Sequence, residues 1–348
     1  MSGQPVETAS PRRLTKHGII SACLIISTRL ILLVLLAAVD FSLTIFSGTV
    51  HAQDASWPDT VTIGTALKGG TYDAYGRGLS TVLRDKAGII AGTRETNGAE
   101  DNLALLSTGD IQIAFTTLGA VLHALKQQPD GADAKHIRAL APMYETAFHF
   151  VVMDRFPART MADLEGKSIG VGPQGGTTAF YVPLIMKALG VNARFVEGEW
   201  TALGDSLAGN GIDVLAVAGG TPFPALLDLG GQQKLRFIPL SRNDQLKIQL
   251  AIPELASTEI PAGNYWQIQG AYPTVGLFNF IVVRDDMPDS IVTAILNALF
   301  GGSETMMAFT PAAAQTVPSN YARNTILAFH TGAARWYQHS LSSADHGD

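Results

Sequence analysis

One local pattern occurs twice in this sequence and limits the folds that the chain can adopt. Residues 61–83 read VTIGTALKGGTYDAYGRGLSTVL, and residues 168–190 read SIGVGPQGGTTAFYVPLIMKALG. Each segment begins as a short apolar strand, turns at Gly-Gly-Thr and continues as a helix with one apolar face. Strand, glycine turn and helix in this order are the building unit of α/β proteins with parallel strands. We therefore predict an α/β fold.

The two Gly-Gly-Thr turns also point to a binding function. Glycine permits a tight turn, and the helix that follows presents free backbone N–H groups and the positive end of its dipole. These features together form an anion site, with Thr71 as the expected cap of the first helix. Two such turns, about a hundred residues apart, indicate two half-sites that face one ligand. Neither turn matches a dinucleotide or nucleoside triphosphate motif.

The rest of the chain continues the alternation of strands and helices in two rounds. Further strands are expected at residues 89–97, 111–116, 137–144, 147–153, 168–172, 193–197, 212–218, 235–240 and 277–283. Further helices are expected at residues 118–126, 177–189, 201–209, 223–229, 243–254, 288–300 and 319–337, and residues 258–276 read as loop and irregular strand.

Two similar apolar runs mark the expected boundaries between lobes. FHFVVMDR and FNFIVVRDD each lie where the composition changes, and we interpret them as the two segments that cross between the lobes of a bilobed protein. The expected organisation is lobe I at residues 53–150, lobe II at residues 151–276, and a return to lobe I with C-terminal helices at residues 277–348. Ligands of open α/β sheets bind at the carboxyl ends of the strands.

The N-terminal segment, residues 1–52, has the features of a signal peptide. Basic residues precede the apolar run LILLVLLAAV at residues 30–39, and Val50-His51-Ala52 offers a cleavage site. The alternative is a membrane anchor over residues 30–50, in which Asp40 would be costly. We expect export to the periplasm. The only cysteine, Cys23, would be removed with the signal, so the mature chain would form no disulfide.

Charge and motifs exclude several functions. The chain carries a net charge of −6, and removal of residues 1–52, with four basic and two acidic residues, leaves −6 − 2 = −8. An acidic chain without a Lys/Arg cluster argues against nucleic acid as a partner. The histidines are scattered, and no nucleophile turn or cysteine nucleophile is present, so we expect no metal, no cofactor and no enzyme activity.

The expected ligand contacts follow the ends of strands at one edge of the sheet. They are Gly69, Gly70, Thr71, Tyr72, Asn97, Gly98, Thr116, Thr117, Gly175, Gly176, Thr177, Thr178, Gly219, Thr221 and Pro222.

Several of these residues also have ordinary structural explanations. Tyr72 can be a core residue, Asn97 or Thr96 a helix cap, and Thr116 and Thr117 strand formers.

Other side chains near the strand ends are further candidates for ligand contacts. Trp200 and Tyr265 can stack on a ligand or simply pack. Lys68 or Arg94 could pair with an anionic ligand, and Glu145, Glu197 or Glu199 could pair with an ammonium group. The alternative is that all five are solvated charges.

Four blocks in order resemble one known family. The chain is similar to the TAXI branch of the substrate-binding proteins of tripartite ATP-independent periplasmic (TRAP) transporters, from about residue 60 to residue 337. The blocks that carry the resemblance are IGTALKGGTYDAYGRGL, TNGAEDNLALLSTGDIQIAF, LEGKSIGVGPQGGTTAFYVPLIMKALGV, and IPAGNY followed by YPTVGLFNFIVVRDDMPDSIVTAILNALF.

The resemblance implies a type II-like periplasmic binding protein with two lobes and a ligand cleft between them. It also implies a carboxylate or amino-acid ligand, often glutamate-like, that is passed to a sodium-coupled membrane permease. A sensor of the same fold that reports to a membrane signalling protein is the alternative. The chain departs from the family where Gly-Ser-Gly-Thr is usual and Gly175-Gly176-Thr177-Thr178 stands here, and again at Asn97-Gly98-Ala99. These departures leave the identity of the ligand open.

Overall fold

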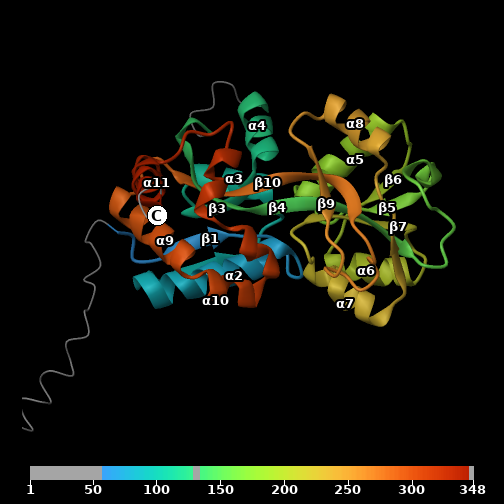
Figure 1. The fold of residues 1–348 in the computed structure, drawn as a ribbon, viewed down its shortest axis with the longest axis horizontal. Coiled ribbons are helices and arrows are strands. Elements are labelled where there is room, and N and C mark those ends of the chain that lie inside the picture. The colour runs from blue at the N-terminus through green and yellow to red at the C-terminus, as the bar shows by residue number, and fades with distance from the viewer. Residues whose placement is uncertain (1–56, 128–133, 345–348) are drawn as a thin grey trace, which may run out of the picture. The chain divides into compact units, whose positions relative to one another are not determined.

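A computed structural model describes residues 57–127 and 134–344 (Figure 1). The expected signal segment, residues 1–52, its cleavage site and Cys23 lie outside the described residues.

The described residues form ten strands, ten α-helices and four short 3₁₀ helices. The strands are β1 (Val61–Gly64), β2 (Ala91–Arg94), β3 (Ile113–Thr117), β4 (Ile137–Met153), β5 (Ser168–Gly170), β6 (Arg194–Val196), β7 (Val214–Gly219), β8 (Leu235–Phe237), β9 (Ala256–Ile260) and β10 (Tyr272–Arg284). The helices are α2 (Thr71–Ala87), α3 (Ala99–Ser107), α4 (Leu118–Gln127), α5 (Thr177–Leu189), α6 (Trp200–Ala208), α7 (Pro224–Gln232), α8 (Arg242–Ala251), α9 (Asp289–Gly301), α10 (Ser303–Phe309) and α11 (Thr331–Ala344). The 3₁₀ helices are η1 (Ala134–His136), η2 (Met161–Leu164), η3 (Pro311–Gln315) and η4 (Pro318–Arg323).

All strands belong to one mixed sheet with the order β2-β1-β3-β10-β4-β7-β5-β6, to which β8 and β9 add at β4 and β10. Strands β1, β2 and β3 are parallel to one another, as are β5, β6 and β7. Strands β4 and β10 pair antiparallel with each other and with their neighbours. Each lobe is thus a small parallel α/β unit, as predicted, and the two crossing strands are the antiparallel exception.

Strands β4 and β10 each run through both lobes (Figure 1). The first part of β4 pairs with β10, and its last part pairs with β7 and β8. The sequence was read as two strands, 137–144 and 147–153, but the structure has one continuous strand of 17 residues. Residues 258–276, expected to be largely irregular, supply most of β9 and the first part of β10. The pairing of strands that cross between the lobes therefore decides where β4, β9 and β10 begin and end, in place of the local sequence pattern.

The pairing of β4 with β10 contains a bulge on β4, where Met143 and Tyr144 together lie opposite Asn279. Phe278 pairs with Glu145, but Phe280 pairs with Pro142, so the register shifts between these two residues of β10. Proline lacks the N–H that a ladder needs, which explains why the irregularity forms here. Asn279 itself stays in register with Thr117 of β3. Its side chain bonds to Tyr144 in the bulge and to the nearby Thr146.

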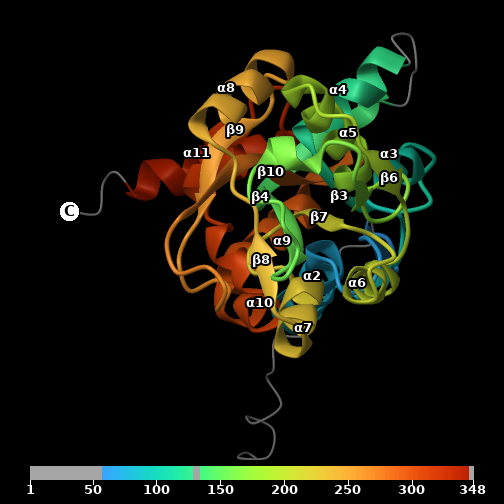
Figure 2. The same cartoon turned by 90° about the vertical axis from the view of Figure 1, so that its right-hand side faces the viewer.

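Three apolar cores fill the two lobes. One lies in lobe I and joins α2, α9 and α11 to strands β1, β3 and β10. The other two cover opposite faces of the lobe II strands, with α5 and α8 on one face and α6 and α7 on the other (Figure 2). Along β4 the core residues change from lobe I to lobe II between Tyr144 and Ala147. On β10 the change falls between Leu277 and Phe280.

The C-terminal part differs from its prediction. The helix expected at residues 319–337 is divided into η4 and α11, and α10 and η3 were not expected.

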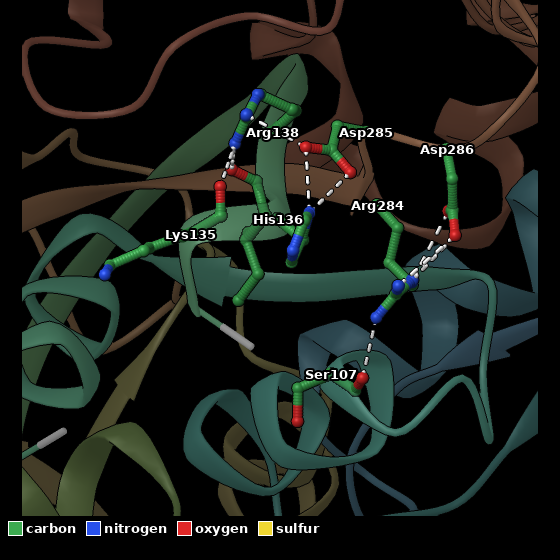
Figure 3. A network of polar contacts seen from close by, with 8 residues as sticks. Ser107, Lys135, His136, Arg138, Arg284, Asp285 and Asp286 are labelled. Atoms are coloured by element: carbon green, nitrogen blue, oxygen red, sulfur yellow. Dashed lines mark hydrogen bonds and ion pairs between the residues drawn. The ribbon is translucent and has the colours of Figure 1, made fainter. Parts of the chain in front are cut away.

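A polar network holds the lobe I ends of β4 and β10 together (Figure 3). Asp285 accepts bonds from Arg138 at 3.0 Å and contacts His136 at 3.0 Å, and Arg284 donates to the carbonyl of Ser107 at 2.7 Å.

Within the described residues no single helix has the length and apolar character of a membrane span. The pair α9 and α10 meets those criteria only when taken together, and it bends by 71° at the break.

The lobes touch where α5 of lobe II meets the start of α4 in lobe I. The Tyr181 hydroxyl lies so close to Gly119 that a Cβ at that glycine would be 1.5 Å from the oxygen. Beside it, the rings of Phe180 and His123 are 4.9 Å apart. The absence of a side chain at Gly119 is therefore what lets the two helices meet.

Gly119→Ala should weaken this contact. The added methyl group must displace Tyr181 or α4, and overpacking of this kind costs about 1–3 kcal/mol. Urea unfolding should show that loss, whereas Gly92→Ala, which meets nothing within 4 Å, should stay within about 0.5 kcal/mol of the parent. Equal stability of the two variants would contradict the packing role of Gly119.

Candidate ligand-binding site

A small cavity lies between the lobes, at the carboxyl ends of the parallel strands. Its volume is about 50 Å³. Its lining comes from both lobes and from both crossing strands, and consists of Ala66, Gly70, Thr71, Tyr72, Asn97, Gly98, Tyr144, Thr146, Pro173, Gly176, Thr177, Thr178, Trp200, Ala218, Gly219, Phe223 and Asn279. A water molecule needs about 10–15 Å³ by this kind of measure, so the space suits a few atoms.

Five helices begin at this cavity. The N-cap residues of α2, α3, α5 and α7 line it, and they are Gly70, Gly98, Gly176 and Phe223. The first residue of α6, Trp200, lines it as well. None of these five helices has a side chain hydrogen-bonded at its N-cap. In α7, however, Pro224 has no N–H, and the N–H groups of the next two residues donate to backbone carbonyls, so this helix offers no free N–H in its first turn. The first N–H groups of α2, α3, α5 and α6 are not satisfied by side-chain caps, and the dipoles of these helices favour negative charge in the cavity.

The capping predictions were wrong in detail. Thr71 was expected to cap α2, but it is the first helical residue after Gly70, and its hydroxyl contacts the carbonyl of Gly220 at 3.4 Å. Asn97 or Thr96 was expected to cap α3, but the N-cap is Gly98, and Asn97 donates to Asp101 instead. Glycine at the N-cap leaves the N–H groups of the first turn open, because it has no side chain that could occupy them.

Two glycine turns from opposite lobes touch beside the cavity. A Cβ on Gly98 would lie 3.2 Å from the Cα of Gly176. A Cβ on Gly176 would lie 3.1 Å from the carbonyl oxygens of Asn97 and Pro173. Gly98 also has φ 125°, which side chains rarely allow. The lobes can come this close only because both turns lack side chains.

Asn279 carries a buried polar network on one wall. Its Nδ2 donates to the carbonyl of Tyr144 at 2.8 Å and to Thr146 Oγ1 at 2.7 Å. Its Oδ1 accepts from the Tyr72 hydroxyl at 2.8 Å. Burial raises the pKa of the Tyr72 and Tyr144 hydroxyls far above the usual value, so both stay protonated. This wall is neutral, and it is rigid because each of its polar side chains is hydrogen-bonded to another group of the wall.

The opposite wall combines a threonine with an aromatic pair. Thr178 Oγ1 accepts from the N–H of Ala218 at 2.9 Å, which ties α5 to β7. The rings of Trp200 and Phe223 meet edge to face at 5.1 Å. Gly172 has φ 73°, and a Cβ there would lie 2.4 Å from the Trp200 ring. The indole therefore depends on this glycine for its place.

A chain of buried hydrogen bonds supports Phe223. The N–H of Phe223 donates to the Tyr265 hydroxyl at 2.6 Å, and that hydroxyl bonds to His149 Nε2 at 3.0 Å. His149 Nδ1 bonds to the carbonyl of Val217 at 3.1 Å, so the neutral ring carries its proton on Nδ1. Burial lowers the pKa of His149 to about 4. Tyr265 is thus a packing and support residue rather than a lining residue.

The structure brings together nine of the residues that the sequence pointed to. Gly70, Thr71, Tyr72, Asn97, Gly98, Gly176, Thr177, Thr178 and Gly219 all line the cavity.

Six further residues were expected at the site and do not line the cavity: Gly69, Thr116, Thr117, Gly175, Thr221 and Pro222. Thr116 and Thr117 are fully buried in β3. Gly69 instead accepts a bond from the N–H of Ala225, which joins the lobes at 3.1 Å.

Sequence reasoning missed the lining residues of the crossing strands and of the turns around them. They are Ala66, Tyr144, Thr146, Pro173, Ala218, Phe223 and Asn279. Trp200 was weighed and set aside as a packing residue, but it lines the cavity. The signal for Asn279 and Thr146 was their place as polar residues inside otherwise apolar strands.

The charged candidates do not line the cavity. Lys68, Arg94, Glu197 and Glu199 are exposed, and Glu145 accepts a bond from Thr258 at 2.8 Å. Among the described residues, no Asp, Glu, Lys, Arg or His side chain lines this cavity. In the same part of the chain, no group of three or more metal-ligating side chains is gathered that could hold an ion.

Two α/β lobes with a cavity between them are also the fold of a solved periplasmic binding protein. The chain belongs to the NMT1-like family, whose model matches residues 63–340. The predicted α/β fold of two lobes is confirmed by its solved neighbours.

These neighbours share the fold at low sequence identity. The periplasmic binding protein BugD is 14% identical with a TM-score of 0.54, over 83% of this chain and 97% of its own. MatC from Rhodopseudomonas palustris, solved with bound malate, is 15% identical with a TM-score of 0.53, over 82% of this chain and 98% of its own. A structure described as a periplasmic transporter is 14% identical with a TM-score of 0.51, over 82% of this chain and 94% of its own.

The buried histidine predicts a pH dependence of stability. In the unfolded chain His149 has a pKa near 6.5, whereas in the folded protein it takes up a proton only near pH 4. The unfolded state therefore binds more protons between these values, and stability should fall as the pH drops through this range, by up to about 3 kcal/mol.

Urea unfolding at several pH values between 7 and 4 would measure this loss. His149→Gln removes the titrating group, so its stability should fall less steeply over the same range. Parallel curves for the parent and His149→Gln would contradict the assignment to His149.

Proposed function

We propose that this chain is an extracytoplasmic solute receptor that binds a small carboxylate or amino-acid-like ligand and delivers it to a sodium-coupled TRAP permease in the membrane. The observation that carries the proposal is the meeting of the N-termini of α2, α3, α5 and α6, without side-chain caps, at one cavity between two lobes. Such N-termini bind anions through backbone N–H groups and helix dipoles.

Further observations support the parts of this proposal. The resemblance of four sequence blocks to the TAXI branch supports a TRAP permease as the partner. The malate in MatC is a small carboxylate held by a protein of similar fold. The signal-like features of residues 1–52 support a location in the periplasm.

Binding would proceed by closure of the lobes around the ligand. Lobe I contributes the turns before α2 and α3, and lobe II contributes the turns before α5, α6 and α7. A carboxylate between these turns neutralises the dipoles of both lobes at once. The ligand thus stabilises the closed arrangement, in which Gly98 and Gly176 are in contact.

A thermal-shift screen of the purified protein against small carboxylates and amino acids tests the proposal. A ligand at a hundred times its Kd should stabilise the fold by about 2.7 kcal/mol, or several degrees. A folded protein that none of these compounds stabilises would contradict it.

Gly176→Ala should weaken binding of any hit. Its methyl group would press on the carbonyl oxygens of Asn97 and Pro173 and hold the lobes apart. An overpacking cost of about 1–3 kcal/mol corresponds to roughly 5- to 150-fold in affinity. Gly231→Ala, also in lobe II but with nothing within 4 Å, is the matched control and should bind like the parent. Equal Kd values for the two variants by calorimetry would refute the role of the glycine contact.

A further inference from the structure

The polar groups of the cavity are unevenly distributed between donors and acceptors. Among the residues that the structure describes, no carboxylate lines it. Of the acids nearby in sequence, Asp101 is engaged with the N–H and the side chain of Asn97, and Glu145 with the hydroxyl of Thr258. The lining therefore provides no anionic partner for an ammonium group.

Two buried threonines each present an unused donor. Thr146 is 3% exposed, and its oxygen accepts a bond from Asn279. Thr178 is 2% exposed, and its oxygen accepts a bond from the N–H of Ala218. A hydroxyl that accepts from the protein still has its own proton to donate. Within the described residues, neither proton has a protein acceptor, so both remain available to a ligand in the cavity.

The side-chain acceptor of Asn279 is already occupied. Its Oδ1 takes the proton of Tyr72, and its two N–H groups are used by Tyr144 and Thr146. The helix N-termini add more donors, because N–H groups point out of the first turn. A ligand in this cavity meets mainly donors.

Size and charge limit the ligand further. A cavity of about 50 Å³ suits a compound of few atoms. Within residues 57–127 and 134–344, no Lys or Arg lines it, so the helix dipoles of this part of the chain balance the ligand's charge. Dipoles of this kind amount to about half an elementary charge each, so the restriction to a single carboxylate comes from the small volume of the cavity and not from the dipoles.

We propose, on the basis of the receptor function proposed above, that the cavity selects a small monoanionic acid whose other polar group is a hydrogen-bond acceptor, as in a short 2-oxo acid, and rejects the 2-amino acid of the same length. The carboxylate lies at the helix N-termini, and the oxo group accepts from Thr146 and Thr178. An ammonium group in the oxo position would face donors and lose its water without gaining a carboxylate.

Calorimetry with matched pairs tests this selectivity on the protein itself. The pairs are pyruvate with alanine, 2-oxobutyrate with 2-aminobutyrate, and 2-oxoglutarate with glutamate. We expect the short 2-oxo acids to bind at least about tenfold more tightly than their amino partners, and more tightly than 2-oxoglutarate. Equal or tighter binding of the amino acids would overturn this inference and leave the receptor function standing. Binding of no member of any pair would overturn both.

Asn279→Asp should reverse the preference. The new carboxylate can still accept from Tyr72, and it gives the cavity the partner that an ammonium group lacks. The ratio of the oxo-acid to the amino-acid Kd should shift by about tenfold or more toward the amino acid. Asn297→Asp, at an exposed position of α9 that accepts a bond from Trp336, makes the same charge change away from the cavity and should leave the ratio unchanged.

A second variant covers the case in which Asn279→Asp does not fold. Thr178→Val removes one free donor and keeps the volume. It should lower the affinity for the 2-oxo acid about tenfold, with a smaller effect on the amino acid. An unchanged ratio in Thr178→Val would contradict the role of the threonine protons.

Discussion

The antiparallel pairing of β4 with β10 is the interaction on which the rest of the structure depends. Both strands pass through both lobes, so each lobe completes its sheet with parts of the same two strands. Where the lobes meet, Pro142 cannot supply a ladder N–H, and β4 bulges opposite Asn279, whose side chain bonds to Tyr144 and Thr146 there. The strands that join the lobes therefore also form one wall of the cavity, and the link between the lobes and the binding surface are the same piece of backbone.

The cavity owes its electrostatic character to the backbone. Five helices start there without side-chain caps, and in the described part of the chain no charged side chain lines it. Charged side chains would bring desolvation costs and pKa shifts with changing pH, whereas N–H dipoles do not titrate. His149 lies behind this wall as a neutral ring that fixes Tyr265 and, through it, Phe223. Selectivity then depends on which hydroxyl protons face the ligand.

Local pattern made the turns and most helices predictable, and long-range pairing made the rest unpredictable. The Gly-Gly-Thr repeat located the starts of α2 and α5, because glycine and amphipathic spacing are local signals. Asn279 and Thr146 were missed, because their meeting follows from a register shift between strands that lie over a hundred residues apart. The same pairing merged two expected strands into β4. Thr71 was misread as a cap, since a threonine after two glycines can be either N-cap or first helical residue, and propensity favours the cap.

The glycine contact between Gly98 and Gly176 has a consequence for how this site changes during evolution. A recognition surface built from N–H groups is inherited as a set of turns rather than as a set of functional side chains. Most positions around it can therefore change in sequence without loss of the anion-binding groups, provided that the glycines of the turns are retained. Neighbours of the same fold at 14–15% identity show how far sequences can diverge on this scaffold. In a more distant descendant, the surviving trace of the site would be the spacing of its glycines.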